Sequence, residues 1–253
     1  MIPRSLLRGG SFLNMEPKER IILALDVADY GQAVEIIEKF REHIDIFKVG
    51  SELFTSVGPR IIEKIHAKGK KVFLDLKYHD IPNTVSRTAI AAAELGVFMF
   101  NVHTLGGFEM MKKTAQTLVD VSLKKNIKRP VLLGVTILTS INQTTLKDEL
   151  GIGQRMNTQV KHLSGLALKA GLDGVVASPH EIEIIRAHCG NGFLIVTPGI
   201  RPSWTQEDDQ KRTMTPGEAL RKGADYLVIG RAVMSQPDPI KALERILKEI
   251  ADI

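Results

Sequence analysis

The sequence has a single cysteine, Cys189, so an intrachain disulfide and a cysteine-based metal cluster are both excluded. Cys189 follows an apolar helical segment, which predicts a small buried side chain. No uninterrupted apolar run reaches the roughly 18 residues that a membrane-spanning helix needs. Aromatic residues make up only 5% of the chain. The core must therefore consist mainly of aliphatic side chains, which is typical of parallel strands covered by helices.

A basic stripe is also missing, although the formal net charge is +5. Basic and acidic residues are interleaved, so nucleic-acid binding is not expected, whereas a small anionic ligand is. Residues 1–14 form a poorly patterned tail, and Arg8 interrupts their apolar stretch, so they make a poor signal peptide. We interpret this tail as disordered or as an added extension. Residues 15–253 then form one domain of a cytoplasmic protein.

Short apolar segments alternate with amphipathic segments of helical length, and the cycle repeats eight times. The predicted strands are Ile21–Asp26, Ile46–Gly50, Lys71–Lys77, Phe98–His103, Val131–Leu138, Gly174–Ala177, Phe193–Thr197 and Tyr226–Gly230. The predicted helices are Tyr30–His43, Pro59–Lys68, Thr84–Leu95, Phe108–Lys125, Gln154–Ala170, Glu181–His188, Pro216–Lys222 and Ile240–Ile250. Because parallel strands need crossover connections, eight repeats favour a single-domain (β/α)8 TIM barrel over an open doubly wound sheet.

Charged residues occur at the ends of the first three predicted strands. In such barrels the chemistry takes place at these carboxyl ends. Residues i and i+2 of a strand share a face, so Asp75 and Lys77 should both point into the barrel mouth. An unpaired buried charge is costly, which makes Lys48 on the neighbouring strand a natural partner of Asp75. A purely structural ion-pair network is the alternative interpretation.

Two glycine–arginine segments end the last two strands, Gly199-Ile200-Arg201 and Gly230-Arg231. Glycine lets backbone N–H groups approach an anion, and arginine supplies forked donors, so these segments predict a phosphate site. The long polar segment Pro202–Thr215 follows the first of them and is interpreted as a closing lid. The acidic residues and histidines at the strand ends do not have a spacing that indicates a metal site.

The segment Asp75-Leu76-Lys77-Tyr78-His79-Asp80-Ile81-Pro82-Asn83-Thr84 resembles the signature of the orotidine 5′-monophosphate decarboxylases. Further segments that match this family in order are Leu25-Asp26, Phe47-Lys48-Val49-Gly50, Thr136–Ser140, Pro198-Gly199-Ile200-Arg201-Pro202 and Gly230-Arg231-Ala232. The resemblance extends from about Arg20 to Ile250.

This resemblance implies conversion of orotidine 5′-monophosphate to uridine 5′-monophosphate, the last step of de novo pyrimidine synthesis, without cofactor or metal. It implies that Lys77 protonates C6 and that a charged array stabilises the reaction. The array would consist of Lys48, Asp75, Lys77 and, from the other subunit of a homodimer, Asp80. The implied substrate-binding residues are Asp26 and Lys48 with Thr84 of the other subunit for the ribose, Thr139 for the pyrimidine, and Arg201, Gln210, Gly230 and Arg231 for the phosphate.

Three points stay open on the sequence alone. Either Thr136 or Thr139 could contact the pyrimidine, and Thr139 is preferred. A Mg²⁺-dependent keto-sugar-phosphate decarboxylase would share the Asp-x-Lys-x-x-Asp core. A barrel that binds a phosphorylated ligand without turning it over is the remaining alternative.

Overall fold

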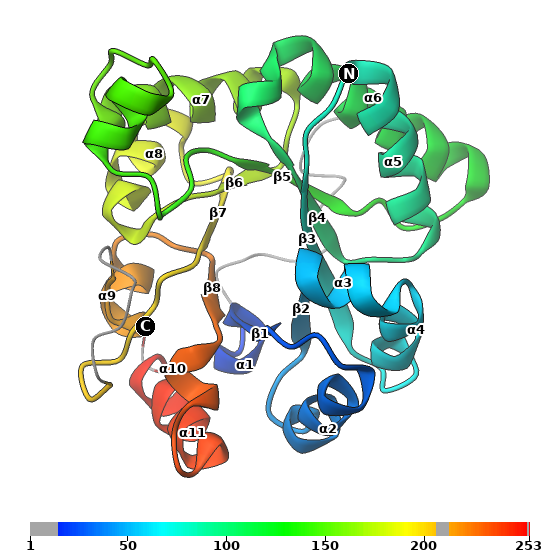
Figure 1. The fold of residues 1–253 in the computed structure, drawn as a ribbon, viewed down its shortest axis with the longest axis vertical. Helices are drawn as coiled ribbons and strands as arrows, with labels where there is room; N and C mark the ends of the chain where they lie inside the picture. The colour runs from blue at the N-terminus through cyan, green and yellow to red at the C-terminus, as the bar shows by residue number, and fades with distance from the viewer. Residues whose placement is uncertain (1–14, 206–212, 252) are drawn as a thin grey trace.

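The computed structural model describes residues 15–205, 213–251 and 253, and the predicted tail 1–14 and Gln210 lie outside them. Eight parallel strands, each paired with its sequence neighbour and the last with the first, close into a barrel (Figure 1). The strands are β1 (Ile21–Leu25), β2 (Ile46–Gly50), β3 (Lys71–Tyr78), β4 (Met99–His103), β5 (Val131–Val135), β6 (Gly174–Val176), β7 (Leu194–Thr197) and β8 (Tyr226–Ile229). The prediction of a (β/α)8 barrel is confirmed.

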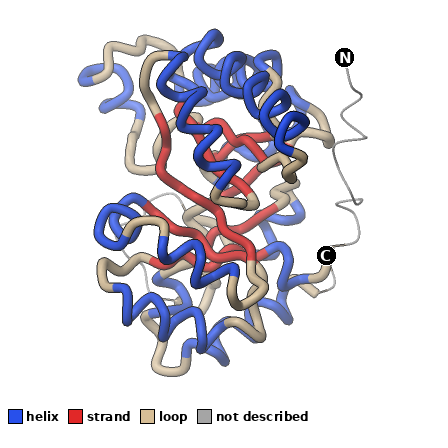
Figure 2. Tube along the Cα trace, turned by 90° about the vertical axis from the view of Figure 1, so that its right-hand side faces the viewer, coloured by secondary structure: helices blue, strands red, loops and turns tan. Residues whose placement is uncertain are grey.

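Helices surround the strands on the outside (Figures 1 and 2). They are α1 (Pro17–Arg20), α2 (Tyr30–Phe40), α3 (Ser51–Val57), α4 (Arg60–His66), α5 (Pro82–Glu94), α6 (Gly107–Lys125), α7 (Met156–Ala170), α8 (Ile182–Cys189), α9 (Pro216–Arg221), α10 (Arg231–Met234) and α11 (Pro239–Glu249). Short 3-10 turns lie at Thr104–Gly106 and Pro179–Glu181, and a π-helical turn lies at Thr145–Glu149. None of the described helices is long and apolar enough to cross a membrane.

The core has two parts because side chains alternate between the two faces of each strand. Ile21, Leu23 and Leu25 of β1 point outward and pack with the helices. The side chains on the opposite face of β1, Ile22 and Ala24, point into the barrel and belong to an inner cluster. This inner cluster is completed by Ile46, Phe73, Met99, Leu133, Leu194, Val196, Tyr226 and Val228. Aliphatic residues dominate both parts, as the low aromatic content predicts.

Three local predictions need correction. Strand β5 ends at Val135 and not at Leu138, which is 36% exposed. Helix α3 was not predicted; it begins directly after β2 without a polar connecting loop. Cys189 is only partly buried, at the end of α8, although its burial is sufficient to raise the pKa of its thiol.

A polar cluster at the amino ends of β7 and β8 joins these two strands to α8. Arg186 donates to the backbone oxygen of Phe193 at 2.7 Å and to Asp225 Oδ2 at 2.8 Å. The same Asp225 oxygen accepts from the Ile195 N–H at 2.7 Å. Burial raises the pKa of Asp225, which the Arg186 charge opposes. The Arg186 and Asp225 side chains are each only 16% exposed, so Asp225 depends on this partner.

Replacing Arg186 by alanine should therefore lower the free energy of unfolding by about 2–4 kcal/mol, because it leaves a largely buried carboxylate without its cation. Denaturant unfolding measures this loss. Arg41→Ala is the matched control, since the Arg41 side chain is 44% exposed and such pairs contribute about 0–1 kcal/mol. An equal loss in the two variants would contradict this account of the cluster.

Candidate active site

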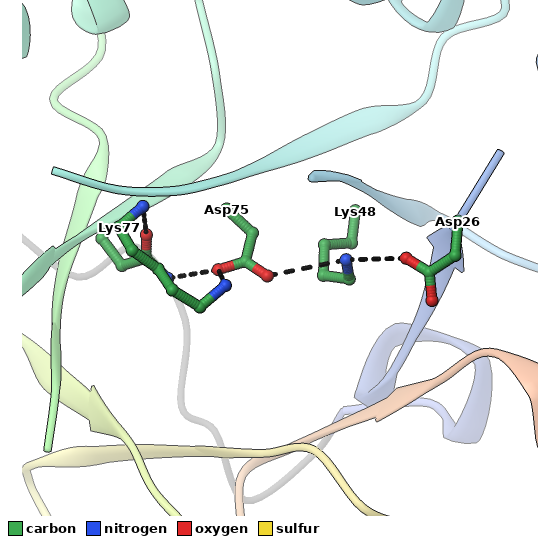
Figure 3. A network of polar contacts seen from close by, with 5 residues as sticks. Asp26, Lys48, Asp75 and Lys77 are labelled. Carbon is green, nitrogen blue, oxygen red and sulfur yellow. Dashed lines mark hydrogen bonds and ion pairs between the residues drawn. The ribbon is translucent and has the colours of Figure 1, made fainter. Parts of the chain in front are cut away.

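Four charged side chains form a row at the carboxyl ends of β1, β2 and β3 (Figure 3). Lys48 Nζ lies 3.1 Å from Asp26 Oδ1 and 3.5 Å from Asp75 Oδ2. The other oxygen of Asp75 accepts from Lys77 Nζ at 2.8 Å. The row thus alternates in sign, with acid, base, acid and base in sequence. Each of the two inner charges, Lys48 and Asp75, lies between two partners of opposite charge.

The inward alternation of the strands places this row. On β1 the inward series Ile22 and Ala24 continues to Asp26, and on β3 Phe73 is followed on the same face by Asp75. Lys48 is paired in register with Ala24, so it lies at the level where the apolar interior ends. Below this level the barrel is filled with apolar side chains, and at this level the charged row begins.

Lys77 reaches the row through an irregular backbone. The β3–β4 pairing steps from Leu74↔Phe100 to Tyr78↔Val102, which leaves three β3 residues opposite one β4 residue. Lys77 itself has φ of 51°, a left-handed conformation that L-residues with a side chain adopt only at a cost. Asp75 and Lys77 do converge, as predicted, but a bulge and not a regular extended strand brings them together.

Burial differs along the row. The side chains of Asp75 and Lys48 are each 12% exposed, whereas Lys77 is 34% exposed and Asp26 is 55% exposed. Asp75 and Lys48 are therefore largely enclosed by the protein, while the more exposed Lys77 side chain lines the cavity. His103 at the end of β4 adds little positive charge, because burial, followed by the charges of His79 and Lys77, lowers its pKa.

A cavity of about 230 Å³ opens above the row. Its charged side consists of Asp26, Lys48, Asp75 and Lys77. Its apolar side consists of Ala24, Phe73, Val135, Ile137, Leu138, Val176, Ala177 and Val228. Thr139, Pro198, Gly199, Arg201, Gly230 and Arg231 complete the lining. A cavity with one apolar wall, a row of charges and two arginines at the β7 and β8 ends suits a planar ring that carries an anionic group.

Most of the predicted site residues meet in this cavity, but two do not. Asp80 and Thr84 are exposed and do not line it. Gln210 and half of the predicted lid, residues 206–212, lie outside the described residues. Of the two threonine candidates, Thr139 lines the cavity, whereas the buried Thr136 donates its hydroxyl to the Val176 backbone oxygen at 3.2 Å.

Sequence reasoning assigned no role to Asn101, which is fully buried on β4 and contacts both Asp75 and Lys77. The sequence did contain a signal for such a role: an amide side chain in the apolar run Met99-Phe100-Asn101-Val102 needs buried hydrogen-bond partners. Among the described residues, no group of three or more His, Cys, Asp or Glu side chains is placed to hold a metal ion.

The fold and this cavity define the class: a (β/α)8 barrel with an Asp/Lys array at the mouth, where enzymes of this fold have their active sites. A sequence model of the orotidine 5′-phosphate decarboxylase / HUMPS family matches residues 19–246, and the chain belongs to this family.

Relatives and solved structures agree with this membership. The orotidine 5′-phosphate decarboxylase of Geotalea uraniireducens is 52% identical over 93% of this chain and 96% of its own length. The enzyme of the same name from Trichlorobacter lovleyi is 54% identical over 93% of this chain and 96% of its own length. The crystal structure of the orotidine 5′-phosphate decarboxylase of Lactobacillus acidophilus aligns with a TM-score of 0.80 at 38% identity, covering 92% of this chain and 99% of that one.

Proposed function

We infer that the protein converts orotidine 5′-monophosphate to uridine 5′-monophosphate and CO₂, the last step of de novo pyrimidine synthesis, and we propose the cytoplasm as its location. The observation that carries the inference is the Lys77–Asp75 pair in the cavity, 2.8 Å apart, in a chain about half identical to named decarboxylases over nearly its full length. Those names also disfavour a keto-sugar-phosphate decarboxylase.

The lining of the cavity supports one orientation of the substrate. The phosphate would bind between Arg201 and the Gly230-Arg231 segment, at the ends of β7 and β8. A Cβ added to Gly230 would lie 3.1 Å from Asp26 Oδ2, so glycine leaves room for the Asp26 carboxylate beside the proposed phosphate site. The ribose would then bind Asp26 and Lys48, and the pyrimidine edge would meet Thr139. In the family pattern Gln210 also holds the phosphate.

In this orientation C6 of the ring faces Lys77. Loss of CO₂ leaves an electron pair at C6 in an orbital that the ring does not delocalise well. The Lys77 ammonium group stabilises this charge and then transfers its proton to C6, so one side chain supplies electrostatic stabilisation and general acid catalysis. Asp75 holds Nζ in place through its 2.8 Å hydrogen bond. Lys48, 3.5 Å from the other Asp75 oxygen, keeps that carboxylate fixed.

We further propose a homodimer in which Asp80 completes the array of the partner subunit and Thr84 contacts the partner's ribose. Two observations support this proposal. Both residues are exposed and neither lines the cavity of its own chain. Between them Ile81 is 67% exposed, a large apolar side chain that a subunit contact would cover. Asp80 Oδ1 accepts from the Ile81 N–H at 2.6 Å, which fixes the start of α5.

An ultraviolet assay of orotidine 5′-monophosphate consumption, run with and without EDTA, tests the proposed function. The array needs no electron sink beyond the protein, so we expect equal rates with chelator, without it and after added Mg²⁺. A rate that falls to background in EDTA and returns with Mg²⁺ would contradict the proposal and favour the metal-dependent alternative. Turnover of a keto-sugar-phosphate acid in place of orotidine 5′-monophosphate would have the same consequence.

A further inference from the structure

Among the described residues of β4, Asn101 is the one whose side chain is hydrogen-bonded to residues of the charged row. It points into the barrel between the outward residues Phe100 and Val102, and it is fully buried. Its Nδ2 donates to Asp75 Oδ1 at 2.6 Å, and its Oδ1 accepts from the Lys77 backbone N–H at 2.8 Å. The orientation of the amide is fixed, because a carboxylate only accepts and a backbone N–H only donates.

Asn101 lies opposite the β3 bulge. Asp75, Leu76 and Lys77 face it where a regular ladder would place a single residue. The bulge removes backbone pairing at this point, and the Asn101 amide, which has the same donor and acceptor as a peptide group, supplies the missing partner to the Lys77 N–H. It thereby holds Lys77 in the left-handed conformation with φ of 51°.

The same amide also fixes the counter-ion. Asp75 Oδ1 accepts from both Asn101 Nδ2 and Lys77 Nζ. Asn101 thus fixes the position of the Lys77 backbone N–H. It also fixes the position of the Asp75 carboxylate, which in turn orients the Lys77 ammonium group. Because asparagine is neutral, it does so without changing the charge of the row. A carboxylate at this position would face Asp75 at hydrogen-bond distance and oppose it.

We propose that Asn101 is a positioning residue for proton transfer to C6: it aims Lys77 Nζ by holding both the Lys77 backbone and Asp75. The inference rests on the proposed function. Asn101 does not line the cavity, and it lies on β4, whereas the arginines that would bind the phosphate follow β7 and β8. Its removal should therefore affect the chemical step far more than the binding of substrate or product.

The first test is Asn101→Ala. We expect kcat to fall about 100-fold, the effect expected of a reacting group displaced by about 1 Å, while KM changes less than about threefold. The Kd of uridine 5′-monophosphate, measured by calorimetry, should also change less than about threefold. Thr104→Val is the matched control: Thr104 is fully buried at the β4 end and donates to the Val135 backbone oxygen at 2.8 Å, but does not contact the row. It should lower Tm and leave kcat unchanged.

The second test is Asn101→Asp, which preserves shape and the acceptor for the Lys77 N–H. At low pH the new carboxyl group and Asp75 would share a proton, which restores a donor to Asp75. At higher pH both would be ionised and repel each other. Relative to wild type, kcat of this variant should therefore be highest near pH 5.5 and fall as pH rises, whereas the ratio for Asn101→Ala should not follow this trend.

The outcomes separate the two claims. If wild type consumes orotidine 5′-monophosphate but Asn101→Ala retains kcat within about threefold, with only Tm lowered, Asn101 is merely structural and the inference is wrong. A pH-independent kcat ratio for Asn101→Asp would overturn it as well. Inactive wild type would instead overturn the proposed function, and the inference with it.

Discussion

Lys77→Ala is expected to lower kcat by about 10⁴-fold or more, because it removes both the cation that stabilises charge at C6 and the proton donor. The fold should persist. Asp75 keeps Asn101 at 2.6 Å and Lys48 at 3.5 Å as partners, so no buried carboxylate is left alone. Steady-state kinetics with Tm from calorimetry measure the two effects separately.

Two further variants test whether the loss of activity is specific to Lys77 and to its ability to release a proton. Lys71→Ala removes a lysine from the other end of the same strand, where Nζ lies over the Phe98 ring at 5.3 Å, and should leave kcat unchanged. Lys77→Arg keeps a cation that does not release its proton near neutral pH, so it should recover little of the lost rate. If Lys77→Ala turned over within tenfold of wild type, Lys77 would not be the proton donor.

Mixing two inactive variants should restore activity if the sites are shared. Lys77→Ala and Asp80→Ala subunits each fail alone, but a heterodimer has one site with Lys77 from one chain and Asp80 from the other. With free exchange, half of the dimers are mixed and each has one intact site, so about a quarter of the wild-type activity should return.

The matched control mixes Lys77→Ala with a chain that carries both substitutions, a combination in which no intact site can form. Native mass spectrometry of differently tagged chains establishes exchange. If exchange is complete and the activity of the first mixture does not exceed that of the control, the shared site is refuted. Near-normal activity of Asp80→Ala alone would also refute it.

The repeating pattern of the sequence predicted the barrel because strand and helix periods are local properties. Glycines at the helix ends, such as Gly171 and Gly223, adopt the positive φ that this position favours. The observed ends of strands and helices differ from the predicted ends where tertiary contacts determine them. Strand β5 stops at Val135 because Val176, the last residue of β6, pairs with it. Helix α3 lies too close to β2 for a loop signal to separate them.

The sequence predicted that the charged residues lie together at the barrel mouth, but it did not predict the contacts of Asn101 with Asp75 and Lys77. Asp26, Lys48 and Asp75 continue an inward face that period-two alternation identifies from sequence. The bulge at Lys77 and the contacts of Asn101 depend on how β3 and β4 are paired. Lys77 and Asn101 are 24 residues apart in the chain, so a local sequence pattern does not indicate that they meet. Likewise, the contact proposed for Asp80 would be made between two subunits, and the sequence pattern of one chain does not indicate how two subunits pack.

The central claim is that this cavity decarboxylates orotidine 5′-monophosphate. The most direct measurement is the stoichiometry of the reaction of purified wild-type protein: uridine 5′-monophosphate by chromatography and CO₂ from substrate labelled at the carboxylate. The account predicts one product molecule and one CO₂ for each substrate consumed, over many turnovers. Tight binding of the substrate with neither product formed would contradict it and would leave a barrel that binds a phosphorylated ligand without turning it over.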